Sequence, residues 1–162
     1  MNRHAPYPLI AATLLLALLL GMLALPEMLA AWRPYWIGLV LVYWLLEAPE
    51  RIGLGLAFLV GLAADLAFGT LIGEQALRLC MLTFIVHRFR ARLRFFPIWQ
   101  QALAVWVLLL NDRLISLAVR IFAGEGVPPV GFWFGPITGA LLWPWLYLLL
   151  DAVRMRWRQR EG

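Results

Sequence analysis

Ionisable residues interrupt one of the most apolar stretches of the sequence, GLAADLAFGTLIGEQALR. Asp65, Glu74 and Arg78 lie in this stretch, and Asp112 and Arg113 stand together in a later apolar stretch. An ionised side chain among apolar helices is costly unless it is paired or hydrated. The simplest prediction is therefore a network that pairs Asp65 or Glu74 with Arg78 or Arg113. Such a network could be a structural lock between helices, a solute or proton site, or a contact with the membrane segment of a partner.

Motifs of hydrolytic enzymes and metal sites are absent from the sequence. It contains no HExxH and no GxSxG motif, and its two histidines, His4 and His87, are not paired. The single cysteine, Cys80, allows neither a disulfide nor a cysteine metal site within one chain. We therefore predict a protein that is not an enzyme, with no catalytic residue, no metal site and no cofactor.

The composition is typical of an all-α integral membrane protein. Hydrophobic residues make up 64% of the chain and charged residues 14%, whereas ordinary soluble domains are about 45–50% apolar. A helix needs roughly 20 apolar residues to cross a bilayer. Six apolar runs approach this length: Leu9–Leu25, Tyr35–Leu46, Ile52–Phe68, Leu71–Val86, Ile98–Phe122 and Phe132–Leu150. We expect a compact bundle of about six transmembrane helices that forms one domain over residues 1–162, without a soluble domain. The short second run leaves five crossings as an alternative.

The arginines predict the orientation in the membrane. Two clusters follow the fourth and sixth runs: Arg88, Arg90, Arg92 and Arg94, then Arg154, Arg156, Arg158 and Arg160. The positive-inside rule places both clusters, and both chain termini, in the cytoplasm. Arg3 and Arg51 then also lie inside, which favours six crossings over five. We expect the clusters to contact anionic lipid or a cytoplasmic partner; the net charge of +5 reports topology, not nucleic-acid binding.

Small residues recur every four positions along the third apolar run and into the turn that follows. Such spacing lets a neighbouring helix approach closely, either within the chain or from a partner. A rise of about 1.5 Å per residue places Asp65 roughly 20 Å above Ile52, near the outer end of this run. The polar residues of the neighbouring runs reach a similar depth. The residues of this predicted helix-packing or partner surface are Gly53, Ala57, Gly61, Asp65, Gly69 and Gly73.

The segment from Trp32 to Leu77 resembles the MreD family of rod-shape-determining inner-membrane proteins. The resemblance covers about a quarter to a third of the chain closely, and length, six-run pattern and basic tail agree with it. Its matching elements are Arg33-Pro34, Tyr43-Trp44, the turn with Pro49, Arg51 and Gly53, the series Gly61, Asp65, Gly69 and Gly73, and Gln75-Ala76-Leu77.

The resemblance implies a non-enzymatic component of the machinery that elongates rod-shaped bacteria. MreD-like proteins accompany MreC, the actin-like MreB, the glycosyltransferase RodA and its partner penicillin-binding transpeptidase. We therefore expect a scaffold in the bacterial inner membrane that binds an MreC-like partner and links it to MreB and the cell-wall synthases. The family's fold is thought similar to the substrate-binding components of vitamin (ECF-type) transporters. A membrane component that binds a small, vitamin-like solute is thus the alternative.

Overall fold

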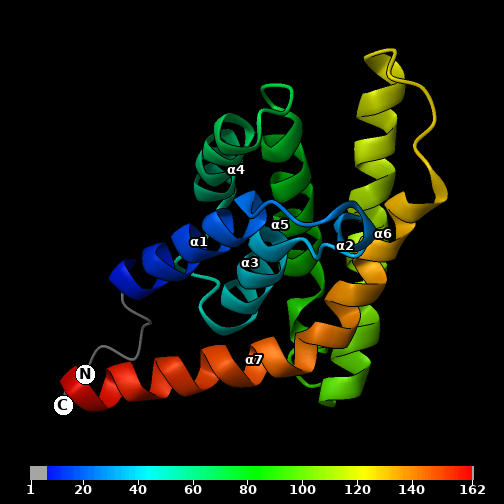
Figure 1. Cartoon of the computed structure of the whole chain (residues 1–162). Coiled ribbons are helices and arrows are strands. Elements are labelled where there is room, and N and C mark those ends of the chain that lie inside the picture. Colours follow the sequence, from blue (N-terminus) through cyan, green and yellow to red (C-terminus); the bar gives the residue numbers. More distant parts are fainter. Residues whose placement is uncertain (1–6, 162) are drawn as a thin grey trace.

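The computed structural model describes residues 7–161, and this part of the chain contains helices and no β-strand (Figure 1). Each of the six apolar runs overlaps one helix of at least 12 residues, which confirms the all-helical class. A short helix and a 3-10 turn are additional, and Arg3 lies outside the described residues. The helices are α1 (Tyr7–Met22), α2 (Glu27–Ala30), α3 (Trp36–Glu47), α4 (Leu54–Phe68), α5 (Glu74–Leu93), α6 (Ile98–Phe122), η1 (Val130–Trp133) and α7 (Phe134–Glu161).

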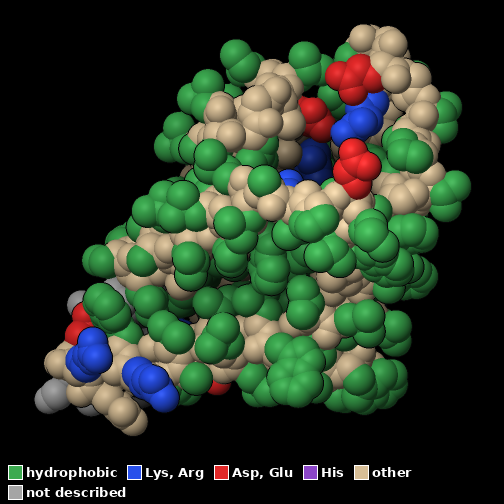
Figure 2. Space-filling view, viewed as in Figure 1, with side chains coloured by type: hydrophobic (Ala, Val, Ile, Leu, Met, Phe, Trp, Pro, Cys, Tyr) green, Lys and Arg blue, Asp and Glu red, His purple; other side chains and the backbone are tan. Residues whose placement is uncertain are grey.

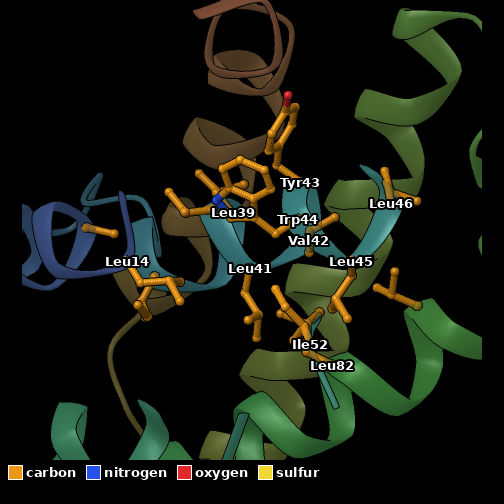
Figure 3. Close-up of a cluster of buried hydrophobic side chains, with 14 of the residues drawn as sticks. Leu14, Leu39, Leu41, Val42, Tyr43, Trp44, Leu45, Leu46, Ile52 and Leu82 are labelled. Carbon is orange, nitrogen blue, oxygen red and sulfur yellow. The ribbon is translucent and has the colours of Figure 1, made fainter. Parts of the chain in front are cut away.

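The short helix α3 forms the centre of the bundle, where α1, α5 and α7 pack around it. Ten of its twelve residues are buried, including the large side chains of Tyr43 and Trp44. Figure 3 shows its side chains pointing in different directions around the helix, toward residues such as Leu14 and Leu82 of its neighbours. A helix that is apolar all round is expected to be buried on every side. The second apolar run is therefore a core helix that contacts protein on nearly every side.

The helices α4 and α5 are antiparallel neighbours that approach each other most closely at Gly61. A Cβ atom at this position would lie 2.6 Å from the backbone nitrogen of Ala76. Ala57 and Asp65 are buried on the same side of α4. The small-residue series was predicted to serve either packing within the chain or contact with a partner. Its central part serves packing within the chain. Gly53 and Gly69, at the two ends of the series, remain exposed.

The two longest helices, α6 and α7, pack side by side and then separate. Figure 1 shows α7 beginning beside α6, bending, and passing below α3, and Pro144 lies within this helix. Proline removes one backbone donor from a helix and favours such a bend. Both basic clusters continue helices, because α5 extends to Leu93 and α7 extends to Glu161.

Two helical segments and the apolar surface are consistent with a membrane protein. By length and composition, α6 and the segment Val130–Glu161 can cross a membrane, whereas α1, α3 and α4 are apolar but shorter. Hydrophobic side chains cover most of the visible face in Figure 2, including its outermost helices. The count of six crossings remains a prediction.

Candidate functional site

A cavity of about 440 Å³ lies where several helices end: α1, α3, α4, α5 and α6. Figure 2 shows acidic and basic side chains gathered in a hollow beside the end of α6. The polar side chains that line the cavity come from four separate segments, and four of these side chains are arginines: Arg33, Tyr35, Thr70, Glu74, Gln75, Arg78, Arg113, Ser116 and Arg120. This cavity brings together most of the ionisable residues that the sequence placed near one level of the bundle.

Asp65 fastens the turn between α4 and α5. Its carboxylate accepts hydrogen bonds from the Thr70 hydroxyl at 2.7 Å and from the backbone N–H groups of Gly73 and Gln75, both at 2.8 Å. The first N–H groups of a helix lack partners within the helix and favour a negative charge. Asp65 therefore caps α5 from across the turn. It does not pair with an arginine, because the bend at Gly73 aims these N–H groups at the carboxylate.

Arg78 holds α5 against α6 through a buried ion pair. Its Nε atom lies 2.8 Å from Oδ1 of Asp112, and its Nη2 atom lies 2.6 Å from Oδ2. Glu74 is a weaker partner, 3.9 Å from Nη1 of Arg78, and its carboxylate also accepts a hydrogen bond of 3.2 Å from Ser116. Arg78, which was predicted to pair with an acid, therefore pairs with both Asp112 and Glu74.

Tyr35 extends this network to the start of α3. Its ring lies 4.4 Å from Cζ of Arg78, and its hydroxyl donates to the side-chain oxygen of Gln75. Gly38 leaves space for the ring, because a Cβ atom there would overlap it. Tyr35, Gln75 and Ser116 were not placed in this network from the sequence. Ser116 was detectable in principle, because it lies one helical turn after Asp112.

Arg113 has no acidic partner among the residues that the structure describes. Its guanidinium lies 4.7 Å from the centre of the Phe132 ring, and that of Arg120 lies 5.3 Å from the same centre. A Cβ atom at Gly135 would lie 2.6 Å from Nη2 of Arg113, so a larger residue there would require the guanidinium to shift. The predicted pairing of Arg113 with Asp65 or Glu74 is not present in the structure.

The motif residues of the two predicted turns lie at opposite ends of the bundle. Arg33, followed by Pro34, donates to the carbonyl of Gly21 at 3.2 Å and to that of Leu23, which ties the α2–α3 connection to the end of α1. Arg51, two residues after Pro49, lies 4.3 Å above the ring of Tyr7. Both arginines therefore stabilise connections between helices.

A second polar network joins the other end of α3 to α7. Arg154 is 2.8 Å from Glu47 and 2.7 Å from Asp151, and Tyr147 donates to Glu47 at 2.7 Å. Arg154 is only 8% exposed. It is therefore unsuited to the contact with lipid or a cytoplasmic partner predicted for it, because two carboxylates draw it into the bundle. The sequence interpretation missed Glu47 and Asp151, although Asp151 and Arg154 have helix-neighbour spacing.

The remaining arginines of the two clusters differ in exposure. Arg90 donates to the carbonyl of Leu46 at 3.1 Å and so packs against the end of α3. The others expose their side chains at the surface: Arg88, Arg92, Arg94, Arg156, Arg158 and Arg160. Within residues 7–161 there is also no group of three or more histidine, cysteine or acidic residues placed to hold a metal ion.

The fold and site define an all-helical membrane protein with an arginine-lined cavity at one end. A family model described as rod shape-determining protein MreD matches residues 1–153. The Rod shape-determining protein MreD of Haemophilus influenzae (strain ATCC 51907 / DSM 11121 / KW20 / Rd) is 32% identical over 130 residues, 76% of each chain. This chain therefore belongs to the MreD family of rod shape-determining proteins. No solved structure matches it, and similarity to vitamin-transporter components remains a prediction.

Proposed function

We propose that this protein is a non-enzymatic membrane scaffold that determines rod shape by binding the membrane segment of an MreC-like partner. The family supports the role in rod shape. The observation that carries the partner proposal is an apolar groove of about 330 Å³ between α1 and α4, here called the α1–α4 groove. Its lining is apolar throughout: Tyr7, Ile10, Ala11, Leu14, Leu15, Leu18, Leu56, Val60 and Ala63.

This groove replaces the small-residue series as the proposed docking surface. The centre of the series packs on α5, so a partner cannot reach Gly61. The groove lies on the adjacent face of the same helix. The small side chains of Ala11 and Ala63 leave space in it. In a bilayer, helices associate where small residues let their backbones approach closely. An apolar helix of a partner therefore fits the α1–α4 groove.

A second apolar groove between α6 and α7 provides a matched comparison. It has a similar volume of about 300 Å³, but Trp99 and Trp106 contribute bulky rings to its lining. Its lining also contains an alanine, Ala140. This α6–α7 groove contacts lipid in the proposed arrangement.

The proposed orientation places the cavity outside and the exposed arginines in the cytoplasm. In α5 the cavity residues Glu74 and Arg78 lie at one end and the basic cluster lies at the other. The positive-inside rule then supports a multi-pass protein of the bacterial inner membrane with both termini cytoplasmic. The exposed arginines contact anionic lipid there, and linkage to MreB, RodA and the transpeptidase is indirect, through the MreC-like partner.

Site-specific photo-cross-linking tests this proposal in cells. A photoreactive amino acid at Ala63 is expected to cross-link to the MreC-like partner, whereas the same amino acid at Ala140 is expected not to. Equal partner cross-linking at the two positions, or none at Ala63 with the protein present in the membrane, would contradict the α1–α4 groove as the docking surface.

A further inference from the structure

We propose that the cavity binds a phosphate group, carried by a lipid headgroup or by a small soluble molecule, with Arg113 as its main ligand. The first observation is the charge balance of the cavity, whose lining contains four arginines and one glutamate. Asp112 and Glu74 both lie beside Arg78. The charges of the other three arginines are not balanced in this way.

These three arginines differ in how strongly the protein binds them. Arg120 lies 3.9 Å from Glu125, and both side chains are about half exposed, so water screens this pair strongly. Arg33 uses its terminal nitrogens on two backbone carbonyls, and its buried Nε atom has no hydrogen-bond partner among residues 7–161. Arg113 has no carboxylate within ion-pair distance in this part of the chain. Its guanidinium is therefore the cation most in need of an anion.

The side chains of Arg113 and Arg120 converge beside the cavity. Arg113 and Arg120 lie on the same ring, that of Phe132. Arg113 and the backbone of Arg33 meet at Gly135, where a Cβ atom would lie 2.6 Å from Nη2 of one and 3.0 Å from the carbonyl oxygen of the other. Two guanidinium groups on one ring repel each other, and an anion bound between them would offset this repulsion. The convergence therefore favours a bound anion.

The donors that remain select the chemistry of the ligand. The hydroxyls of Tyr35, Thr70 and Ser116 already donate to side-chain oxygens of the protein. Guanidinium N–H groups are the main donors left for a ligand, and their planar fork matches phosphate oxygens. A phosphate offers more acceptor oxygens and more charge to several arginines than a carboxylate does. The arginine-rich wall therefore favours phosphate.

The surroundings of the cavity suit a phosphate that is attached to a larger molecule. A volume of about 440 Å³ exceeds the needs of one small ion. The helix α2, which contributes Ala30 to the lining, exposes the apolar side chains of Met28 and Leu29 beside it. A lipid headgroup in the cavity would place its acyl chains along such apolar surface. In the proposed orientation these arginines also lie on the side that the positive-inside rule disfavours, and a ligand accounts for them there.

The experiment uses the purified chain in neutral detergent, without any partner, so its result is independent of the scaffold proposal. The unfolding midpoint is followed as inorganic phosphate replaces chloride at constant ionic strength. The wild type and Arg156→Gln, which removes an exposed arginine far from the cavity, are expected to show the same saturable rise. Arg113→Gln is expected to bind phosphate at least tenfold more weakly. Equal responses of Arg113→Gln and Arg156→Gln, or an equal rise with acetate, would overturn the proposal.

A second variant keeps the test decisive if Arg113→Gln does not fold. Arg113→Lys preserves the charge and loses the planar fork, so it is expected to bind phosphate more weakly than the wild type. Affinity equal to the wild type would contradict Arg113 as the main ligand. Stabilisation by an uncharged vitamin, with no response to phosphate, would also overturn the proposal.

The source of the phosphate follows from the lipid that the protein retains. Phosphatidylglycerol that copurifies is quantified by mass spectrometry for Arg113→Gln and Arg156→Gln. Lower retention by Arg113→Gln identifies a lipid headgroup, and equal retention with weakened phosphate binding identifies a soluble molecule. Both results support a phosphate site.

Discussion

Arg78 and Asp112 join α5 to α6 by two parallel hydrogen bonds of 2.8 and 2.6 Å, and both side chains are nearly inaccessible to solvent. Removing one partner of a buried ion pair leaves the other charge unpaired, which is far more costly than removing both. The pair therefore fixes the relative position of these helices and holds Arg78 in the lining of the cavity.

The first prediction separates the two partners of this ion pair. Asp112→Leu is expected to lower the free energy of unfolding by about 3–5 kcal/mol, because it leaves Arg78 buried without its main partner. The double variant Arg78→Met/Asp112→Leu is expected to be more stable than Asp112→Leu alone. Unfolding midpoints in detergent measure both. A double variant no more stable than Asp112→Leu would contradict a direct pair.

The second prediction concerns Asp65 as the cap of α5. Asp65→Ala is expected to cost roughly 1–3 kcal/mol, because it leaves buried N–H groups without acceptors. Hydrogen exchange at the amides of Gly73 and Gln75 is expected to accelerate. The control is Glu125→Ala, which changes an exposed acid. Unchanged exchange at both amides would show that another group caps the helix.

The third prediction compares two glycines of α4. Gly61→Ala is expected to destabilise the protein by at least about 1–3 kcal/mol, because its Cβ atom would overlap the backbone of α5. Gly55→Ala is the matched control, since nothing lies within 4 Å of a Cβ atom at that position. Its effect is expected to be small or favourable, because alanine is the better helix former. Equal unfolding midpoints for the two variants would contradict the close approach of α4 and α5.

The fourth prediction contrasts two arginines of the basic tail. Arg154→Gln is expected to lower the unfolding midpoint, because it leaves Glu47 and Asp151 without their cation. Arg156→Gln removes the same charge at an exposed position and is expected to change the midpoint little. If both variants unfolded at the same temperature, the network between α3 and α7 would not contribute to stability.

Composition and the apolar runs were sufficient to predict the six main helices, because each run is long enough to define one. The helices that pack against α3 could not be predicted in this way, because a helix that is apolar on all sides has no face that marks its neighbour. The depth argument placed Asp65, Glu74, Arg78 and Asp112 near one another. In the structure Glu74 and Arg78 line the cavity, and Asp65 and Asp112 bind the lining residues Gln75 and Arg78.

The partners of the polar residues could not be predicted, because they depend on side-chain direction and on backbone donors. Asp65 accepts hydrogen bonds from the backbone N–H groups of Gly73 and Gln75, and backbone donors cannot be recognised from residue type. Arg154 looked like its exposed neighbours in an alternating basic run, but its direction on α7 turns it toward Glu47. The resemblance of the chain to MreD identified the family, and the location of the groove required the structure.

The amount of MreC-like partner recovered with the protein from mild detergent tests the scaffold account most directly. Ala63→Phe fills the α1–α4 groove, and Ala140→Phe makes the same change in the α6–α7 groove. At equal levels of folded protein, the account predicts that Ala63→Phe loses most of the partner and that Ala140→Phe retains it. Equal recovery with the two variants would contradict it.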